Sequence, residues 1–144
     1  MPLRHAEAHW SGGLKAGHGV MQAGQEISGA PYSFGSRFQE SQGSNPEELL
    51  GAAEAGCYSM AFSQLLEQEG HSPRNIDASA DVHLDPKDGG FKITAIDLNV
   101  EAVVPGIDNK TFQSLAEKAR SNCPVSQAMS GLKINLNARL LKGA

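Results

Sequence analysis

The chain contains Asn45-Pro-Glu-Glu-Leu-Leu-Gly-Ala-Ala-Glu-Ala-Gly-Cys-Tyr-Ser-Met60, the beginning of its longest predicted helix. Asn45 can cap this helix, Pro46 suits the first helical position, and the two glutamates that follow face the positive end of the helix dipole. The spacing from Ser44 to Glu47 also matches a capping box. These signals predict a firm helix start at Pro46.

The body of this helix is small and apolar, and it should run from about Pro46 to Glu69 and stop at Gly70. Glycine in a helix interior lowers helix propensity, and alanine buries little apolar surface. Their density therefore indicates that another backbone packs very close to this helix. A chain of 144 residues has little with which to bury such a helix on every side, so we expect a homodimer core. The small residues are Gly51, Ala52, Ala53, Ala55, Gly56, Ser59, Ala61 and Ser63.

Strands are predicted on both sides of the long helix. Residues 1–40 are rich in glycine and read as short strands joined by turns, with Ser33–Phe38 at the end of the run. After the helix, residues 78–84 alternate with period two, and residues 91–104 form a longer strand with a phase slip near Thr94 that suggests a bulge. A turn of hairpin type joins these two strands.

A second helix and a last strand complete the pattern. Asp108 or Asn109 caps the helix, which should end just before Pro124, and residues 125–129 add another helical turn. Residues 132–140 close the chain as a strand with one apolar and one polar face. The predicted fold class is α+β with antiparallel sheets.

Composition narrows the functional classes. With 144 residues, 40% hydrophobic and 19% charged, the chain reads as one globular domain over residues 1–144. A net charge of −4 gives no basic surface for nucleic acid. The polar N-terminus and the absence of a long apolar run predict no signal peptide and no membrane span, so we expect a cytoplasmic protein.

Two cysteines make up the whole cysteine complement. Cys57 lies in the middle of the long helix, and Cys123 lies beside the helix-stopping Pro124. They are 66 positions apart, so only the fold can bring them together. In a reducing compartment, paired cysteines are more typical of transient redox chemistry than of a structural disulfide. By themselves, two cysteines also fit inert, small hydrophobic residues.

The cysteine motifs resemble one known family. Together they are similar to the osmotically inducible protein C / organic hydroperoxide resistance (OsmC/Ohr) family, and to its OsmC branch more than to its Ohr branch. The resemblance covers nearly the full chain, in order. It rests on Asn45–Leu50, Ala55–Met60 and Asn122–Ser126, supported by Pro31–Phe38, Asp81–Leu84 and Val104–Ile107.

This resemblance implies an intertwined homodimer in which strands of both subunits wrap two central helices. It also implies a thiol-dependent peroxidase without a cofactor, acting on organic hydroperoxides and reset by a dithiol reductant such as a lipoyl-bearing protein. Cys57 would attack the peroxide and become a sulfenic acid, and Cys123 would resolve that acid as an intramolecular disulfide.

Charged residues near Cys57 bear on its reactivity, because apolar burial raises the pKa of a thiol. The resemblance assigns Arg37 to the site as the activating cation and matches Glu47 to the family's Asn-Pro-Glu motif, as the carboxylate partner of Arg37. Glu47 lies roughly 15 Å along the helix from Cys57 and about 80° around it, so it cannot touch Cys57 from one straight helix. Glu54, three residues before Cys57, would oppose a thiolate unless it points to solvent.

Other readings of these residues remain open. Cys57 and Cys123 can be packed thiols, Arg37 can bridge surface carboxylates, and Glu47 is also a good residue for a helix start. The five histidines are not spaced as zinc ligands, so we expect no metal. The alternative function is a stress-associated binding protein in which Cys57 is only a redox-sensitive pocket thiol.

Overall fold

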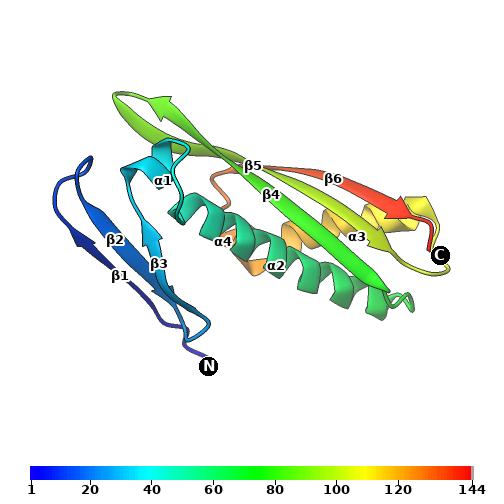
Figure 1. Ribbon diagram of the computed structural model, residues 1–144. Helices are drawn as coiled ribbons and strands as arrows, with labels where there is room; N and C mark the ends of the chain where they lie inside the picture. Colours follow the sequence, from blue (N-terminus) through cyan, green and yellow to red (C-terminus); the bar gives the residue numbers. More distant parts are fainter. Residues whose placement is uncertain (144) are drawn as a thin grey trace. The chain divides into compact units, whose positions relative to one another are not determined.

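The computed structural model describes residues 1–143, which fall into two compact units that divide between Leu49 and Leu50. The first unit contains an antiparallel sheet of β1 (Ala6–Ser11), β2 (His18–Ala23) and β3 (Ile27–Tyr32), in that order (Figure 1). The predicted short strands of residues 1–40 are therefore confirmed. The expectation of a single domain over residues 1–144 stays a prediction.

The end of the predicted strand run is wrong in one place, because residues 34–38 form a short helix, α1 (Phe34–Phe38). The side chain of Ser33 accepts a hydrogen bond from the backbone N–H of Ser36 at 3.1 Å, and the Ser36 hydroxyl accepts one from the backbone N–H of Ser33 at 2.9 Å. This reciprocal capping box satisfies backbone donors that a strand would have left to a neighbouring strand. Two serines three residues apart thus turn the chain.

The long helix α2 (Pro46–Gln68) starts and stops where the sequence predicts. Asn45 caps it by accepting from the backbone N–H of Glu48 at 2.7 Å, and its amide donates to the Glu48 carboxylate at 2.8 Å. The reciprocal pair is therefore Asn45 with Glu48, one residue later than the spacing from Ser44 to Glu47 suggested. Gly70 takes a φ of +82°, the left-handed conformation that commonly ends a helix. Because Glu48 serves the cap, the Glu47 carboxylate is left for another partner.

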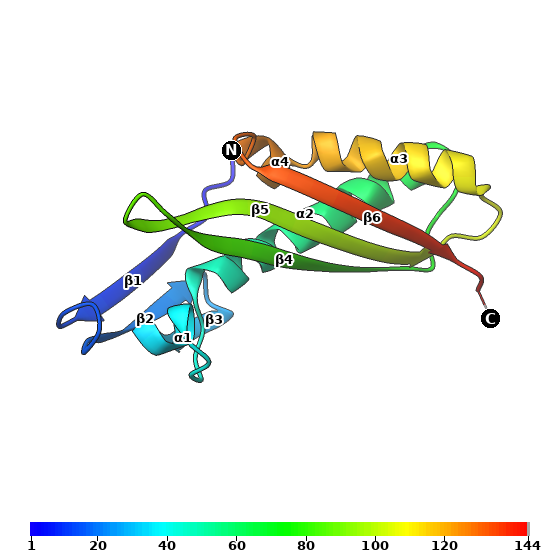
Figure 2. The ribbon, with the colours of Figure 1, turned by 90° about the horizontal axis from the view of Figure 1, so that it is seen from above.

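The second unit is built on a sheet of β4 (Asn75–Lys87), β5 (Gly90–Val103) and β6 (Lys133–Leu141), in that order (Figure 2). β4 and β5 form a hairpin whose two loop residues, Asp88 and Gly89, both have positive φ, as the tight hairpin turns require. His83 pairs with Ala95 and Leu84 with Ile93, so the register shifts at the predicted bulge. β4 extends beyond the predicted residues 78–84 at both ends, whereas β5 and β6 each lie within one residue of the predicted bounds.

β6 corrects the expectation of wholly antiparallel sheets, since it pairs with β5 in parallel. Between these strands run α3 (Asn109–Asn122) and α4 (Pro124–Ala128), which carry the chain back to the end where β5 began. Parallel neighbours need a crossover of this kind, whereas a hairpin gives antiparallel ones. The polar and apolar alternation of residues 132–140 is the same for either direction, so the pattern alone could not decide.

One face of this sheet carries the core of the second unit. Alternate residues of the three strands are apolar on that face, and α2 and α3 pack against it (Figure 2). The rings of Tyr58 and Phe62 lie 5.6 Å apart, those of Phe62 and Phe112 lie 5.3 Å apart, and the Tyr58 hydroxyl donates to the Ala116 carbonyl at 3.0 Å. This packing fixes α2 against α3 and so positions the residues near the end of α3.

Within residues 1–143, no helix combines the length and the apolar character that crossing a membrane requires.

Candidate active site

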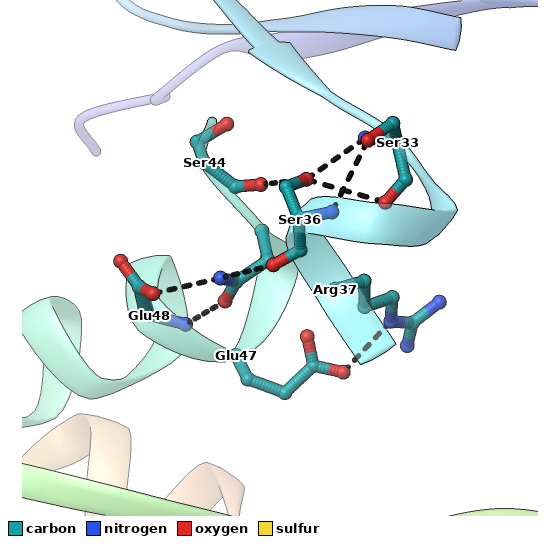
Figure 3. Close-up of polar contacts among 7 residues, drawn as sticks. Ser33, Ser36, Arg37, Ser44, Glu47 and Glu48 are labelled. Carbon is teal, nitrogen blue, oxygen red and sulfur yellow. Dashed lines mark hydrogen bonds and ion pairs between the residues drawn. The ribbon is translucent and has the colours of Figure 1, made fainter. Parts of the chain in front are cut away.

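Arg37 and Glu47 form an ion pair in the first unit. Arg37 comes from α1 and Glu47 from the first turn of α2, and the Arg37 Nε donates to the Glu47 Oε1 at 2.8 Å (Figure 3). The predicted partnership of these two residues is present, and it depends on the helical turn of α1 that the sequence pattern did not predict.

The ion pair is held by hydrogen bonds around the start of α2. The Ser36 hydroxyl donates to the Ser44 carbonyl at 2.7 Å, and the Asn45 amide donates to the Ser36 carbonyl at 3.2 Å (Figure 3). Ser44 in turn donates to the Pro31 carbonyl from its backbone N–H at 2.7 Å and its hydroxyl at 2.9 Å. These bonds fix α1 to the first turn of α2.

The two partners differ in burial. The Glu47 side chain is only 9% exposed, whereas that of Arg37 is 37% exposed. Glu47 Oε1 takes the bond from Arg37, and the buried Oε2 has no hydrogen-bond partner. A buried carboxylate is costly unless a cation compensates it, so Arg37 stabilises Glu47 as much as Glu47 orients Arg37. The Arg37 guanidinium also lies 5.1 Å from the centre of the Phe38 ring.

An apolar pocket of about 250 Å³ lies beside Arg37 in the first unit. Aromatic rings form most of its wall, with the rings of Trp10 and Tyr32 5.3 Å apart and those of Phe34 and Phe38 5.0 Å apart. Tyr32, Phe34 and Phe38 all line this pocket, and the Arg37 guanidinium borders it.

Cys57 and Cys123 meet in the second unit as a pair of free thiols that hydrogen-bond to each other. Cys57 lies in α2 and is partly exposed, while Cys123 is fully buried at the junction of α3 and α4. Pro124 occupies the first position of α4, and this forces the chain to turn at Cys123. The predicted convergence of two distant cysteines is therefore a property of this fold.

Burial raises the pKa of the Cys57 thiol above its ordinary value. The hydrogen bond with Cys123 and the charge of Glu54 raise it further, whereas the backbone N–H of Val125, in the first turn of α4, lowers it by hydrogen bonding to the sulfur. Together, these interactions within the second unit raise the pKa of Cys57 and favour its thiol form over the thiolate. A cation near the Cys57 sulfur would lower this pKa again.

Glu54 does not point to solvent, because it is fully buried. Its Oε1 accepts a hydrogen bond from the hydroxyl of Ser126 in α4, and its Oε2 has no hydrogen-bond partner. Sequence reasoning gave Ser126 no role. Its position three residues after Cys123 on a short helix was the available signal.

The structure thus joins the four predicted site residues as two pairs, Arg37 with Glu47 in the first unit and Cys57 with Cys123 in the second. Among residues 1–143, no three His, Cys, Asp or Glu side chains are grouped in a way that would hold a metal ion.

Comparison with known proteins places the cysteine motifs in a family. Residues 39–137 match the family described as OsmC-like protein. The chain is also 45% identical over 138 residues to the peroxiredoxin OsmC of Escherichia coli, which covers 95% of this chain and 96% of that protein. The chain belongs to the OsmC-like family.

Similarity to a protein named for organic hydroperoxide resistance is lower. The organic hydroperoxide resistance protein of Xanthomonas axonopodis is 33% identical over 90 residues, covering 62% of this chain and 61% of that protein. The higher identity and coverage of the OsmC protein agree with the predicted branch.

Solved structures of the OsmC-like family share the fold. The OsmC-like protein of Mycoplasma pneumoniae superposes with a TM-score of 0.74 at 17% identity, covering 97% of this chain and 98% of that one. An organic hydroperoxide resistance protein of Elizabethkingia anophelis gives a TM-score of 0.71 at 22% identity, with coverage of 97% and 99%. The predicted OsmC-like α+β fold is confirmed.

Proposed function

We propose that this protein is a thiol peroxidase that reduces organic hydroperoxides to alcohols. The observation that carries the proposal is the hydrogen-bonded pair of free thiols, Cys57 and Cys123, in a member of the OsmC-like family. The names of the relatives, a peroxiredoxin and an organic hydroperoxide resistance protein, support the same chemistry.

In the first step, the Cys57 thiolate attacks one peroxide oxygen and the O–O bond breaks. The sulfur becomes a sulfenic acid, and the other oxygen takes up a proton and leaves as the alcohol. Cys57 suits this step because its side chain is partly exposed, whereas Cys123 is fully buried and less accessible to a substrate.

In the second step, the Cys123 sulfur attacks the Cys57 sulfur and the S–O bond breaks. The proton of Cys123 ends on the departing hydroxyl, which leaves as water, and an intramolecular disulfide remains. A dithiol then reduces this disulfide by two exchanges and becomes a disulfide itself, so the enzyme needs no bound cofactor.

Activation of Cys57 is assigned to the N–H of Val125 and to the guanidinium of Arg37. The N–H lowers the pKa of Cys57 directly, and a guanidinium keeps its charge at any physiological pH. Glu47 serves as the positioning residue for Arg37 through the 2.8 Å ion pair.

Opposite charges should shift the thiol titration in opposite directions. Arg37→Ala is expected to raise the pKa of Cys57, because it removes a stabilising cation, and Glu54→Gln to lower it, because it removes an opposing charge. Thiolate absorbance against pH, with Cys123→Ser in every protein, measures both. Glu67→Gln, an exposed change on α2, is the matched control. An unchanged titration in Arg37→Ala would remove Arg37 from the site.

The cysteine roles give the decisive test of the proposed function. Cys57→Ser should abolish the reduction of cumene hydroperoxide. Cys123→Ser should consume about one equivalent per subunit and then stop, because no thiol resolves the sulfenic acid. Peroxide consumption and mass spectrometry of Cys57 measure these outcomes. Single-turnover activity in Cys57→Ser equal to that of the wild type would contradict the assignment and favour the stress-associated binding protein.

The pocket beside Arg37 supports an organic substrate and an apolar reductant. Each buried methylene contributes about 0.8 kcal/mol, so cumene hydroperoxide should exceed hydrogen peroxide in kcat/KM by at least about tenfold. Dihydrolipoamide, a slender dithiol, should reset the enzyme more efficiently than glutathione at equal thiol concentration. Steady-state kinetics with the two peroxides, and then with the two thiol reductants, tests both expectations. A preference for hydrogen peroxide, or equal efficiency of the two thiols, would argue against an apolar site.

A homodimer is part of the proposal. Ala53, Gly56 and Met60 follow one another at helical spacing on α2, and each is exposed on the single chain. Leucine at Ala53 or Gly56 should therefore destabilise the protein by roughly 1–3 kcal/mol, by overpacking a partner's surface. Light scattering of the wild type and thermal unfolding of the variants test this. A well-folded monomer would show that no partner covers this face.

A further inference from the structure

Glu54 is a buried acidic residue that the proposed peroxide chemistry does not use. It is fully buried, its Oε2 has no hydrogen-bond partner, and its Oε1 is bonded by the hydroxyl of Ser126. A buried carboxylate with one unbonded oxygen destabilises the folded protein. Its charge also opposes formation of the Cys57 thiolate. In the first step of the reaction, Glu54 therefore disfavours the reactive thiolate form of Cys57.

The position of the hydrogen bond between Glu54 and Ser126 indicates a different step that Glu54 can serve. Glu54 is three residues before Cys57 on α2, and Ser126 is three residues after Cys123, on α4. Each partner of the bond is therefore about one helical turn from one of the two sulfurs. The bond therefore links the same two segments of the chain as the thiol pair does.

Disulfide formation needs this link more than peroxide attack does. The attacking sulfur of Cys123 must approach the Cys57 sulfur along the line of the S–O bond that breaks, so the two segments must hold a fixed spacing. α4 has only five residues and, at its N-terminus, no side-chain cap, so it has few bonds of its own to fix its place. Ser126 is the buried residue of this helix.

We propose that Glu54 is a positioning residue for the resolving step: by accepting the hydrogen bond of Ser126, it holds the turn that carries Cys123 against Cys57. This inference rests on the proposed peroxidase function and deepens it. The atoms balance as in that function, with the Cys123 proton leaving in water and no further oxidant or reductant required. The bond to Ser126, rather than the charge of Glu54, performs the positioning.

Four variants separate the hydrogen bond from the charge. Ser126→Ala removes the bond and keeps the charge, and Glu54→Ala removes both. Glu54→Gln removes the charge but keeps an oxygen that can accept from Ser126, and Ser126→Thr keeps the hydroxyl. Ser121→Ala, an exposed serine change on α3 near Cys123, is the matched control for Ser126→Ala.

The experiment is a single turnover of each full-length protein with one equivalent of cumene hydroperoxide. Samples are quenched at intervals, and mass spectrometry gives the sulfenic acid of Cys57, trapped by dimedone, and the disulfide. The rate of disulfide formation is then compared with the rate of sulfenic acid formation in the same protein. A fold defect, which melting curves would reveal, lowers both rates. Lost positioning lowers the rate of disulfide formation more than the rate of sulfenic acid formation.

Ser126→Ala and Glu54→Ala should slow disulfide formation by about tenfold, a change of the order that a hydrogen bond to a charged group contributes. They should also accumulate sulfinic acid at Cys57 in excess peroxide, because the sulfenic acid persists. Ser126→Thr, Glu54→Gln and Ser121→Ala should stay within about threefold of the wild type, because each keeps a hydrogen bond between positions 54 and 126.

Two results would overturn the inference. One is wild-type disulfide formation in Ser126→Ala, which would show that the bond positions nothing. The other is a Glu54→Gln protein as slow as Glu54→Ala, which would assign the effect to the charge instead. Should Glu54→Ala fail to fold, the comparison of Ser126→Ala with Ser126→Thr decides. A wild-type protein that forms no sulfenic acid would contradict the proposed function itself, which keeps the two failures distinct.

Discussion

The cap of α2 by Asn45 is the constraint on which the site residues depend. It fixes the first residue of the helix, and the helical repeat then places Glu47, Glu54 and Cys57 at set heights and angles along it. Because Glu48 is used by the cap, Glu47 is left to bind Arg37. A helix that began one residue earlier or later would rotate all three side chains by about 100°.

Two buried carboxylates on α2 are compensated in different ways. Glu47 is met by a guanidinium, which keeps a full positive charge beside it. Glu54 is met only by a hydroxyl, and each keeps one oxygen without a hydrogen-bond partner. In the proposed function, the first arrangement orients the cation that activates Cys57, and the second links two segments of the chain although its charge opposes the thiolate. The proposed chemistry needs both, because peroxide attack depends on charge and disulfide formation depends on spacing.

Local sequence signals predicted much of the architecture. The start and stop of α2, the cap of α3 by Asp108 and the bulge opposite His83 and Leu84 each depend on a few neighbouring residues. α1 was missed because its capping box consists of two serines, which occur in many turns. The pairing of Arg37 with Glu47 followed from the family motif, since nothing in the spacing of the two residues requires it.

The sequence by itself determined which residues can carry the chemistry: two cysteines, one of them beside a proline, and a helix with a strong start. Only the tertiary structure decided that β6 lies parallel to β5, that the two thiols touch, and that Glu54 turns inward to Ser126. The physical reason is the same in each case. Local patterns fix hydrogen bonds between residues a few positions apart, whereas contacts across 66 or 72 positions depend on how whole elements pack.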